Sequence, residues 1–432
     1  MMPRFLLLIV ACVTLGCQPA SDAGLDDPMV LNAELHRRVA STVAVNQSGQ
    51  AAHAWVSNVP GPSEEQPWVS YGQLGVQVEG QPLYTLPNAD HWPVVDPESA
   101  PQVATGPGGA VYVAYTNAED PENIWNATDI HLLRSLDGGT TWMPPVSIGG
   151  GFGSYRNNHE LHVAADGTLY LAWLDADAVL DDEGYIHVVV SRSDDQGATW
   201  SAPVVVDAEP SCECCRVAVT SDADGRVYIA WRKILDGGIR DIVAASSTDG
   251  GTSWSAPALV FADNWVQEYC PDAGPALAID AQGKLHVAWW TGKSGAAGVK
   301  YTSTADGRTF AAPVELQITE ESRAAHVQLA VQGDDVAVVW DDGTLPMPRI
   351  ALRRSLDGGQ SFAPVAHLSP DGAMVAYPNV ALGSAEWQVS WTQQGTADAP
   401  SRWHDTASDA AWLAQTDTQT PQLVTRRGAL DN

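Results

Sequence analysis

One eight-residue phrase recurs along this chain and restricts its fold more than any other feature. The phrase follows the rule Ser-x-Asp-x-Gly-x-x-aromatic. Complete copies begin at Ser135, Ser193, Ser247 and Ser355, and a copy shortened by one residue begins at Thr304. The copies return about every 50 to 60 residues, a period typical of repeat architectures. The chain is therefore expected to be a series of similar structural units.

Each residue type in the phrase has a mechanical role. Asp and Ser side chains hydrogen-bond nearby backbone amides, and glycine adopts positive φ without a steric cost, so together they close a tight hairpin turn. The aromatic residue is expected to fill the gap beside the neighbouring sheet. The Asp and aromatic positions are Asp137, Trp142, Asp195, Trp200, Asp249, Trp254, Asp306, Phe310, Asp357 and Phe362.

The phrase is identified as the Asp-box, or BNR repeat, and resembles the repeat of the sialidase superfamily of β-propellers. In that superfamily the box lies in the outer hairpin turn of a propeller blade, away from the active site. The resemblance therefore indicates architecture and leaves the chemistry open.

A second repeat, a hairpin that ends in an aromatic residue, alternates with the boxes. Its copies end at Trp55, Tyr115, Trp173, Trp231, Trp289, Trp340 and Trp391. Strand-forming residues bounded by Gly, Asp and Pro fill the chain, which favours an all-β protein. We predict a single all-β domain, residues 36–427, with seven four-stranded propeller blades. Six blades, as in most sialidases of the superfamily, is the alternative.

The N-terminal residues are predicted to form a targeting segment. A short apolar stretch follows Arg4, and Thr14-Leu15-Gly16-Cys17 resembles a bacterial lipobox whose cysteine is lipidated. We expect a lipoprotein signal over residues 1–17, a lipid anchor on Cys17 and a flexible tether over residues 18–35; ordinary signal cleavage is the alternative. The expected location is the outer membrane or cell surface, facing the periplasm or the exterior.

The formal net charge of the 432 residues is −30. A surface this acidic repels nucleic acid and anionic membrane, so we exclude nucleic acid as a partner. The charge is explained by an acidic, solubilising coat, and it would also attract cations.

The chemically rich residues precede the innermost strand of each unit, where a propeller would bring them to one rim of its channel. Four cysteines, Cys212, Cys214, Cys215 and Cys270, lie in such positions in adjacent units. Disulfides are expected in an exported protein, but a bridge between neighbours Cys214 and Cys215 would be strained. Grouped thiolates also bind copper(I) or zinc, with His159, His326 and Met374 or Met347 as further donors. A disulfide, a metal site and a redox thiol all remain open.

The superfamily resemblance implies a second chemistry at the same rim. Sialidases clamp an anionic sugar with three arginines and use a tyrosine nucleophile activated by a glutamate, with an aspartate as acid/base. The matching rim residues are Arg156, Glu160, Arg216, Asp272, Arg323 and Tyr377. The Phe/Tyr-Arg-Ile-Pro motif that carries the first arginine in the family is absent, which weakens this interpretation. Surface or interblade salt bridges are the alternative explanation of the arginines.

Three functions follow from these patterns. The leading hypothesis is a surface-tethered binding protein with a cysteine-rich rim site that holds copper or zinc. The alternative is a glycoside hydrolase of exo-sialidase type, and the third is an assembly factor or scaffold for a protein partner. A glycan or a protein is the expected ligand, and the sequence leaves the oligomeric state open.

Overall fold

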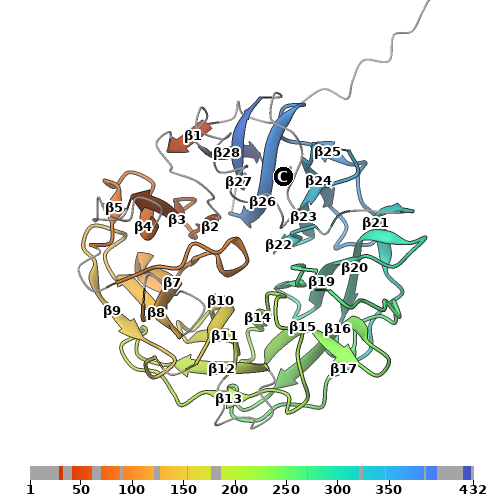
Figure 1. Cartoon of the computed structure of the whole chain (residues 1–432), viewed down its shortest axis with the longest axis horizontal. Helices are drawn as coiled ribbons and strands as arrows, with labels where there is room; N and C mark the ends of the chain where they lie inside the picture. Colours follow the sequence, from red (N-terminus) through yellow and green to blue (C-terminus); the bar gives the residue numbers. More distant parts are fainter. Residues whose placement is uncertain are drawn as a thin grey trace, which may run out of the picture.

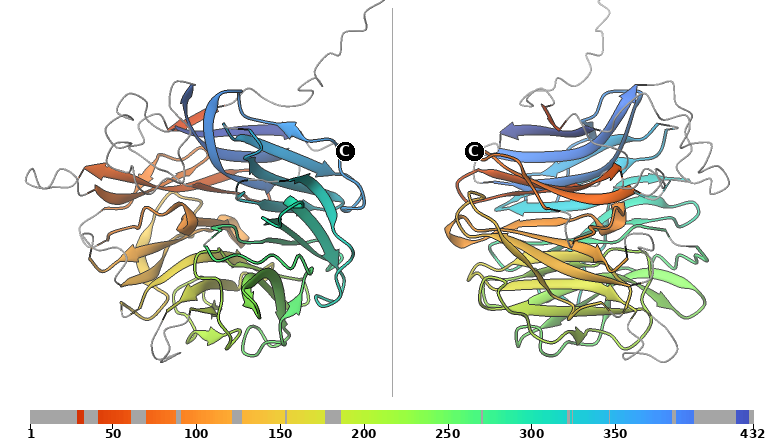
Figure 2. Two further views of the ribbon diagram at one scale, coloured as in Figure 1. Left: turned by 45° about the vertical axis from the view of Figure 1, so that its right-hand side comes forward. Right: turned by 60° about the vertical axis from the view of Figure 1, so that its left-hand side comes forward.

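In the computed structural model, the chain forms seven four-stranded antiparallel sheets arranged around a central channel (Figure 1). The structure describes residues 29–32, 41–60, 70–87, 91–120, 127–152, 154–176, 186–269, 271–320, 323, 325–345, 347–383, 386–396 and 422–429. The prediction of seven blades is confirmed, and the side views show the sheets stacked around the ring (Figure 2). None of the described helices is long and apolar enough to cross a membrane.

The first three blades follow the chain in order. Blade 1 comprises β2 (Ser41–Val45), β3 (Ala51–Pro60), β4 (Ser70–Val78) and β5 (Tyr84–Thr85). Blade 2 comprises β6 (Gln102–Thr105), β7 (Val111–Ala118), β8 (Thr128–Ser135) and β9 (Met143–Ser147). Blade 3 comprises β10 (Arg156–Val163), β11 (Leu169–Asp175), β12 (His187–Ser193) and β13 (Val204–Val205). Two short 3-10 helices, η1 (Pro97–Ser99) and η2 (Pro107–Gly109), flank β6.

The next three blades repeat the pattern. Blade 4 comprises β14 (Ala218–Ser221), β15 (Val227–Leu235), β16 (Ile239–Ser247) and β17 (Ala258–Leu259). Blade 5 comprises β18 (Ala276–Ile279), β19 (Leu285–Thr291), β20 (Ala297–Thr304) and β21 (Val314–Thr319). Blade 6 comprises β22 (Gln328–Gln332), β23 (Asp335–Asp342), β24 (Arg349–Ser355) and β25 (Ala366–His367).

Blade 7 joins the two ends of the described chain. It comprises β26 (Ala373–Leu382), β27 (Glu386–Thr396), β28 (Gln422–Ala429) and, as its outermost strand, β1 (Met29–Asn32). Residues 29–32 therefore do not belong to a flexible tether, contrary to our boundary of 18–35, because their backbone pairs with β28 in the ladder. The remainder of the expected tether and the signal lies outside the described residues.

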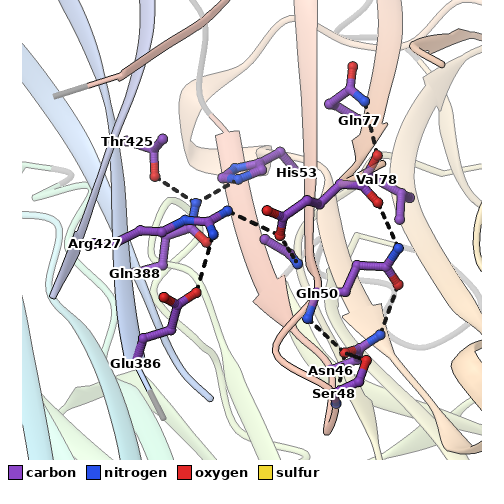
Figure 3. Close-up of polar contacts among 12 residues, drawn as sticks. Asn46, Ser48, Gln50, His53, Gln77, Val78, Glu386, Gln388, Thr425 and Arg427 are labelled. Carbon is purple, nitrogen blue, oxygen red and sulfur yellow. Dashed lines mark hydrogen bonds and ion pairs between the residues drawn. The ribbon is translucent and has the colours of Figure 1, made fainter. Parts of the chain in front are cut away.

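Polar side chains fill the junction between the last blade and the first (Figure 3). The Gln388 amide on β27 hydrogen-bonds His53 on β3 at 3.0 Å and Thr425 on β28 at 2.7 Å. Arg427 on β28 pairs with Glu79 at 3.1 Å, just beyond β4. Strand pairing and these cross-blade contacts together close the ring.

Consecutive blades pack through apolar clusters that include the aromatic residue of the second strand. Trp231 packs with Tyr170, Leu174 and Val188 of blade 3, for example. The seven aromatic residues that ended the predicted hairpins lie on β3, β7, β11, β15, β19, β23 and β27, and all are buried. Burying so large a side chain contributes about 1.5–3 kcal/mol, so each repeat stabilises the junction it forms.

The Asp-box turns lie between the third and fourth strands of blades 2 to 6. In the first box the Ser135 hydroxyl donates to Asp137 at 2.8 Å and accepts the Gly139 N–H, while Asp137 accepts the Thr141 N–H at 2.8 Å. The bonds recur in the boxes at Ser193, Ser247 and Ser355 and, in shortened form, at Thr304. Trp142 stacks on Tyr84 of the preceding blade, with ring centroids 5.1 Å apart. The predicted role of the box is therefore confirmed.

Candidate functional site at the channel rim

The loop that carries three cysteines is attached to the second strand of its own blade. Residues 212–216 connect blade 3 to β14 at the rim of the channel. The Cys212 N–H donates to the Arg232 carbonyl on β15 at 3.0 Å, and Ser211 forms a β-bridge with Lys233. These backbone bonds hold Cys212 beside β15 independently of any side-chain contact.

The three sulfur atoms form a compact triangle. Cys212 Sγ lies 3.3 Å from Cys215 Sγ and 3.7 Å from Cys214 Sγ, and the third side measures 3.9 Å. None of these three pairs is a disulfide, because a disulfide would require a separation of about 2.05 Å. Three thiolates at about 2.3 Å from a tetrahedral zinc ion would lie about 3.8 Å apart. The sulfur positions therefore suit a single metal ion.

Cationic side chains stabilise a thiolate in this cluster. Arg240 Nη1 donates to Cys212 Sγ at 3.0 Å. Hydrogen bonds from Cys214 and Cys215, and then the charges of Arg232 and Arg240, hold the pKa of Cys212 far below its usual range although the thiol is buried. Burial raises the pKa of Cys215. The cluster therefore has one strongly favoured thiolate, and Cys214 is its partly exposed member.

The loop before β18 packs directly against the cysteine loop. The buried Arg232 guanidinium donates to the Ala273 carbonyl at 2.8 and 3.1 Å and to the Trp290 carbonyl at 2.7 Å. A Cβ at Gly274 would meet the Arg216 backbone at 2.1 Å, so only glycine permits this approach. In the same loop, the Asp272 side chain hydrogen-bonds Cys214.

Acidic and aromatic residues from three other blades continue the rim beyond Asp272. His326 Nε2 lies 2.8 Å from Glu98 on η1, and its Nδ1 lies 2.5 Å from Asp341 at the end of β23. Although burial lowers it, these two carboxylates raise the pKa of His326 to about 10. The Tyr377 ring packs on His326 with centroids 4.4 Å apart.

Asp272 lies between this acidic group and the cysteines. Burial, and then the nearby charge of Glu98, raise the pKa of Asp272 to about 6. A carboxyl group with such a pKa can donate a proton near neutral pH. The rim thus combines a soft-metal donor set with a candidate acid.

The three arginines of the sialidase hypothesis lie in different environments. Arg156, on β10, is buried and donates through Nε to Asp175 at 2.8 Å, with Asp129 3.6 Å away. Arg216 faces the channel, where its guanidinium bonds the Gln328 amide oxygen in that amide's favoured orientation. Arg323 is exposed and lies against Gly343. One guanidinium is therefore buried in an ion pair, one faces the channel and one belongs to an exposed residue.

A small polar cavity occupies the channel beneath the rim. Its volume is about 120 Å³, and residues of all seven inner strands line it. Burial raises the pKa of Glu160 to about 7 although the Arg216 charge opposes the shift. Pockets for drug-sized ligands measure about 300–1,000 Å³, so a sugar residue would have to bind at the mouth of the channel rather than inside it.

The remaining predicted donors lie elsewhere or outside the described residues. His159 is buried, and its Nε2 lies 3.1 Å from the Ala114 carbonyl, with Thr116 at its Nδ1. His326 is held between its two carboxylates, and Met374 is buried in β26. Cys270 lies outside the described residues. The described ligand group is therefore Cys212, Cys214 and Cys215.

Sequence reasoning missed four residues that shape the rim: Glu98, Asp341, Arg232 and Arg240. Glu98 reaches the site from a short helix 228 positions away from His326. Arg232 and Arg240 interrupt apolar strand sequences, and a charge within a buried strand is a signal that could have identified them.

Comparisons with known proteins agree on the architecture. Residues 81–270 match the family described as BNR repeat-like domain. No curated protein matches the sequence.

Three solved structures resemble the fold. A protein of unknown function from Dyadobacter fermentans is 18% identical, with 76% of this chain and 94% of that chain covered and a TM-score of 0.50. The polysaccharide lyase Uly1 is 13% identical, with 90% of each chain covered and a TM-score of 0.53. The Hadza microbial sialidase Hz136 is 17% identical, with 74% of this chain and 71% of that chain covered and a TM-score of 0.49.

Proposed function

Since the BNR repeats and the seven-bladed ring support membership of the sialidase superfamily, we propose that this propeller is a binding protein whose rim takes up one copper(I) or zinc ion. The observation that carries the proposal is the triangle of Cys212, Cys214 and Cys215 sulfurs, 3.3–3.9 Å apart. Grouped thiolates select these two ions among the common biological metals.

The surrounding charges fit this role. Three thiolates around a monovalent or divalent ion leave a net negative charge, and burying such a charge is costly unless cations lie nearby. Arg240 donates to Cys212 Sγ, and Arg232 contributes a second positive charge close by. Cys214 is the partly exposed ligand, and so it provides the route by which an ion enters.

The proposal includes export and a lipid anchor at Cys17. A thiol site on an exported protein would otherwise be exposed to oxidation, and a bound ion would protect it. Replacing Cys17 with serine should release the protein from the membrane fraction and abolish incorporation of labelled fatty acid. A Cys17→Ser protein that keeps both properties would refute the anchor.

Metal content measured together with free thiols tests the binding function. Protein from residue 18 onward, purified without chelator, should carry about one equivalent of copper or zinc. Cys214→Ser and Cys215→Ser should each lose the metal and retain the circular dichroism spectrum of the parent. Metal-free protein with no titratable thiols would instead mean disulfides and would reject the proposal.

A second candidate, an exo-sialidase-type glycoside hydrolase, is favoured by one group of residues. Asp272, with its raised pKa, lies on the same rim as Glu98, His326 and Tyr377. In that reading Asp272 is the acid and Tyr377 the nucleophile. Hydrolysis of a sialoside that is lost in Tyr377→Phe would establish this activity. Turnover that survives the substitution would reject Tyr377 as the nucleophile.

A further inference from the structure

We infer that the Asp272 carboxylate is the fourth ligand of the rim site, which would make it a zinc site with three sulfurs and one oxygen. This inference rests on the proposed function and specifies which of the two ions the site prefers. Asp272 belongs to blade 5 and the three cysteines precede blade 4, so the ion would join two neighbouring blades.

Contact with the cysteine cluster is the first support. The Asp272 side chain hydrogen-bonds Cys214, the partly exposed thiol of the triangle. The carboxylate lies outside the group of ligand atoms within 4.8 Å of one another that the three sulfurs form. It would therefore move toward Cys212 and Cys215 when an ion binds. Three sulfurs leave one vertex of a tetrahedron open, and structural zinc sites are almost always four-coordinate.

The loop that carries Asp272 is rigidly held in this position. Arg232 donates twice to the carbonyl of the next residue, Ala273, and Gly274 packs on the backbone of Arg216. Arg232 also donates to the Arg240 carbonyl at 2.7 Å. One buried guanidinium therefore attaches the Asp272 loop to the strand hairpin that supports the cysteines.

The backbone at Asp272 is strained, which favours a function for its carboxylate. Its φ is +50°, in the left-handed region that glycine occupies most easily. Backbone strain of this kind is concentrated at functional sites. Glycine would relieve the strain but would remove the carboxylate.

Ligand chemistry and charge both favour zinc. Carboxylate oxygen is a hard ligand that zinc accepts at about 2.0–2.2 Å, whereas copper(I) prefers soft sulfur. Three thiolates, one carboxylate and Zn(II) sum to two negative charges. Arg232 and Arg240, whose charges act on Cys212, balance them.

Competition titrations with Zn(II) and with Cu(I) test the inference on the full propeller, reduced with a non-thiol reagent and kept free of oxygen. Asp272→Asn should weaken Zn(II) binding by at least about tenfold, the lower end of the loss seen even for outer-shell partners, and should leave Cu(I) binding unchanged. Asp224→Asn is the matched control, because Asp224 is an exposed carboxylate in the turn after β14, at the far end of that strand. It should leave both affinities unchanged.

Co(II) substitution counts the sulfurs independently, because each thiolate adds to the charge-transfer absorption. The Asp272→Asn protein should keep the absorption of three thiolates, and Cys270→Ser should not reduce it. If Cys270→Ser weakens Zn(II) binding and lowers the absorption, Cys270 is the fourth ligand and the inference is overturned. Equal Zn(II) affinities for Asp272→Asn and the parent overturn it as well. Retention of metal by Cys214→Ser would instead reject the proposed function itself.

Discussion

The outer Asp-box turns and the channel rim differ in backbone conformation and in the residues they contain. The boxes repeat one set of hydrogen bonds five times and place glycine at most positions of positive φ. At the rim, Asn158 on β10, Asp272 before β18 and Tyr377 on β26 have positive φ, and buried charges lie nearby. Regular turns thus form the architecture, and the strained backbone and buried charges are concentrated at the candidate site.

Removing the buried arginine of the rim should produce the largest effect. Arg232→Met leaves the carbonyls of Ala273, Trp290 and Arg240 without their donor, at a cost of about 3–5 kcal/mol. Urea denaturation should show this loss, and bound metal should fall with it. The control Arg226→Met, in a turn of the same blade, should change stability by less than about 0.5 kcal/mol. Similar losses for both variants would remove the distinction between rim and turns.

The pH dependence of stability should have opposite signs in the two regions. Burial raises the folded-state pKa of Glu160 from 4.5 to about 7, so its contribution to stability is full below about pH 4.5 and is lost as the pH rises to 7. Glu160→Gln should therefore gain about 2 kcal/mol relative to the parent at pH 8 and little at pH 5.

In the box, hydrogen bonds from Ser253 lower the pKa of Asp249 to about 2, so its contribution is present above its unfolded pKa of 3.8 and is lost on acidification. Urea titrations of Glu160→Gln and Asp249→Asn across this pH range would compare the two. A Glu160→Gln difference that does not change with pH would contradict the assignment.

Disrupting a single Asp-box should lower the stability of the protein modestly and leave its metal binding unchanged. Ser247→Ala removes the acceptor of the buried Gly251 N–H, which should cost about 1–2 kcal/mol in thermal or urea unfolding. Metal content should not change, because the box lies at the outer edge of blade 4. Thr252→Ala, at an exposed position of the same turn, is the control. Loss of metal in Ser247→Ala would show that the two regions are coupled.

The smallest predicted effect is a gain. Gln196 occupies, at φ +60°, the position that Gly138, Gly250 and Gly358 occupy in the other complete boxes. Gln196→Gly should therefore stabilise the protein by about 0.5–1 kcal/mol, because a left-handed non-glycine residue is strained. A lower melting temperature would show instead that the Gln196 side chain contributes contacts that outweigh the strain.

The blades could be predicted from the sequence because each repeat is local. Trp173 and its six counterparts mark hairpins whose partners lie only a few residues away. Strand β1 could not be predicted in this way, since Met29-Val30-Leu31-Asn32 is short and its partner is at the other end of the chain.

The candidate site was predictable in position and only partly in composition. The proximity of Cys212, Cys214 and Cys215 follows from their spacing, and the structure brings the sulfurs together. His159 lies in the predicted rim segment, yet its ring bonds Ala114 and Thr116 of blade 2, because a β-bulge in β10 sets the direction of each side chain. The contribution of Glu98 depends on a contact across the ring, which no local pattern encodes.

The strand pairing that closes the ring also sets the time at which folding can finish. Met29 pairs with Thr425, so the first described strand must wait for nearly the whole chain to be made. At about 5–20 residues per second, that delay is roughly 20–80 s. Until then the nascent protein is an open arc with an unpaired strand at its end, a form that invites pairing with other chains. Factors that protect the growing chain should therefore matter most just before synthesis ends.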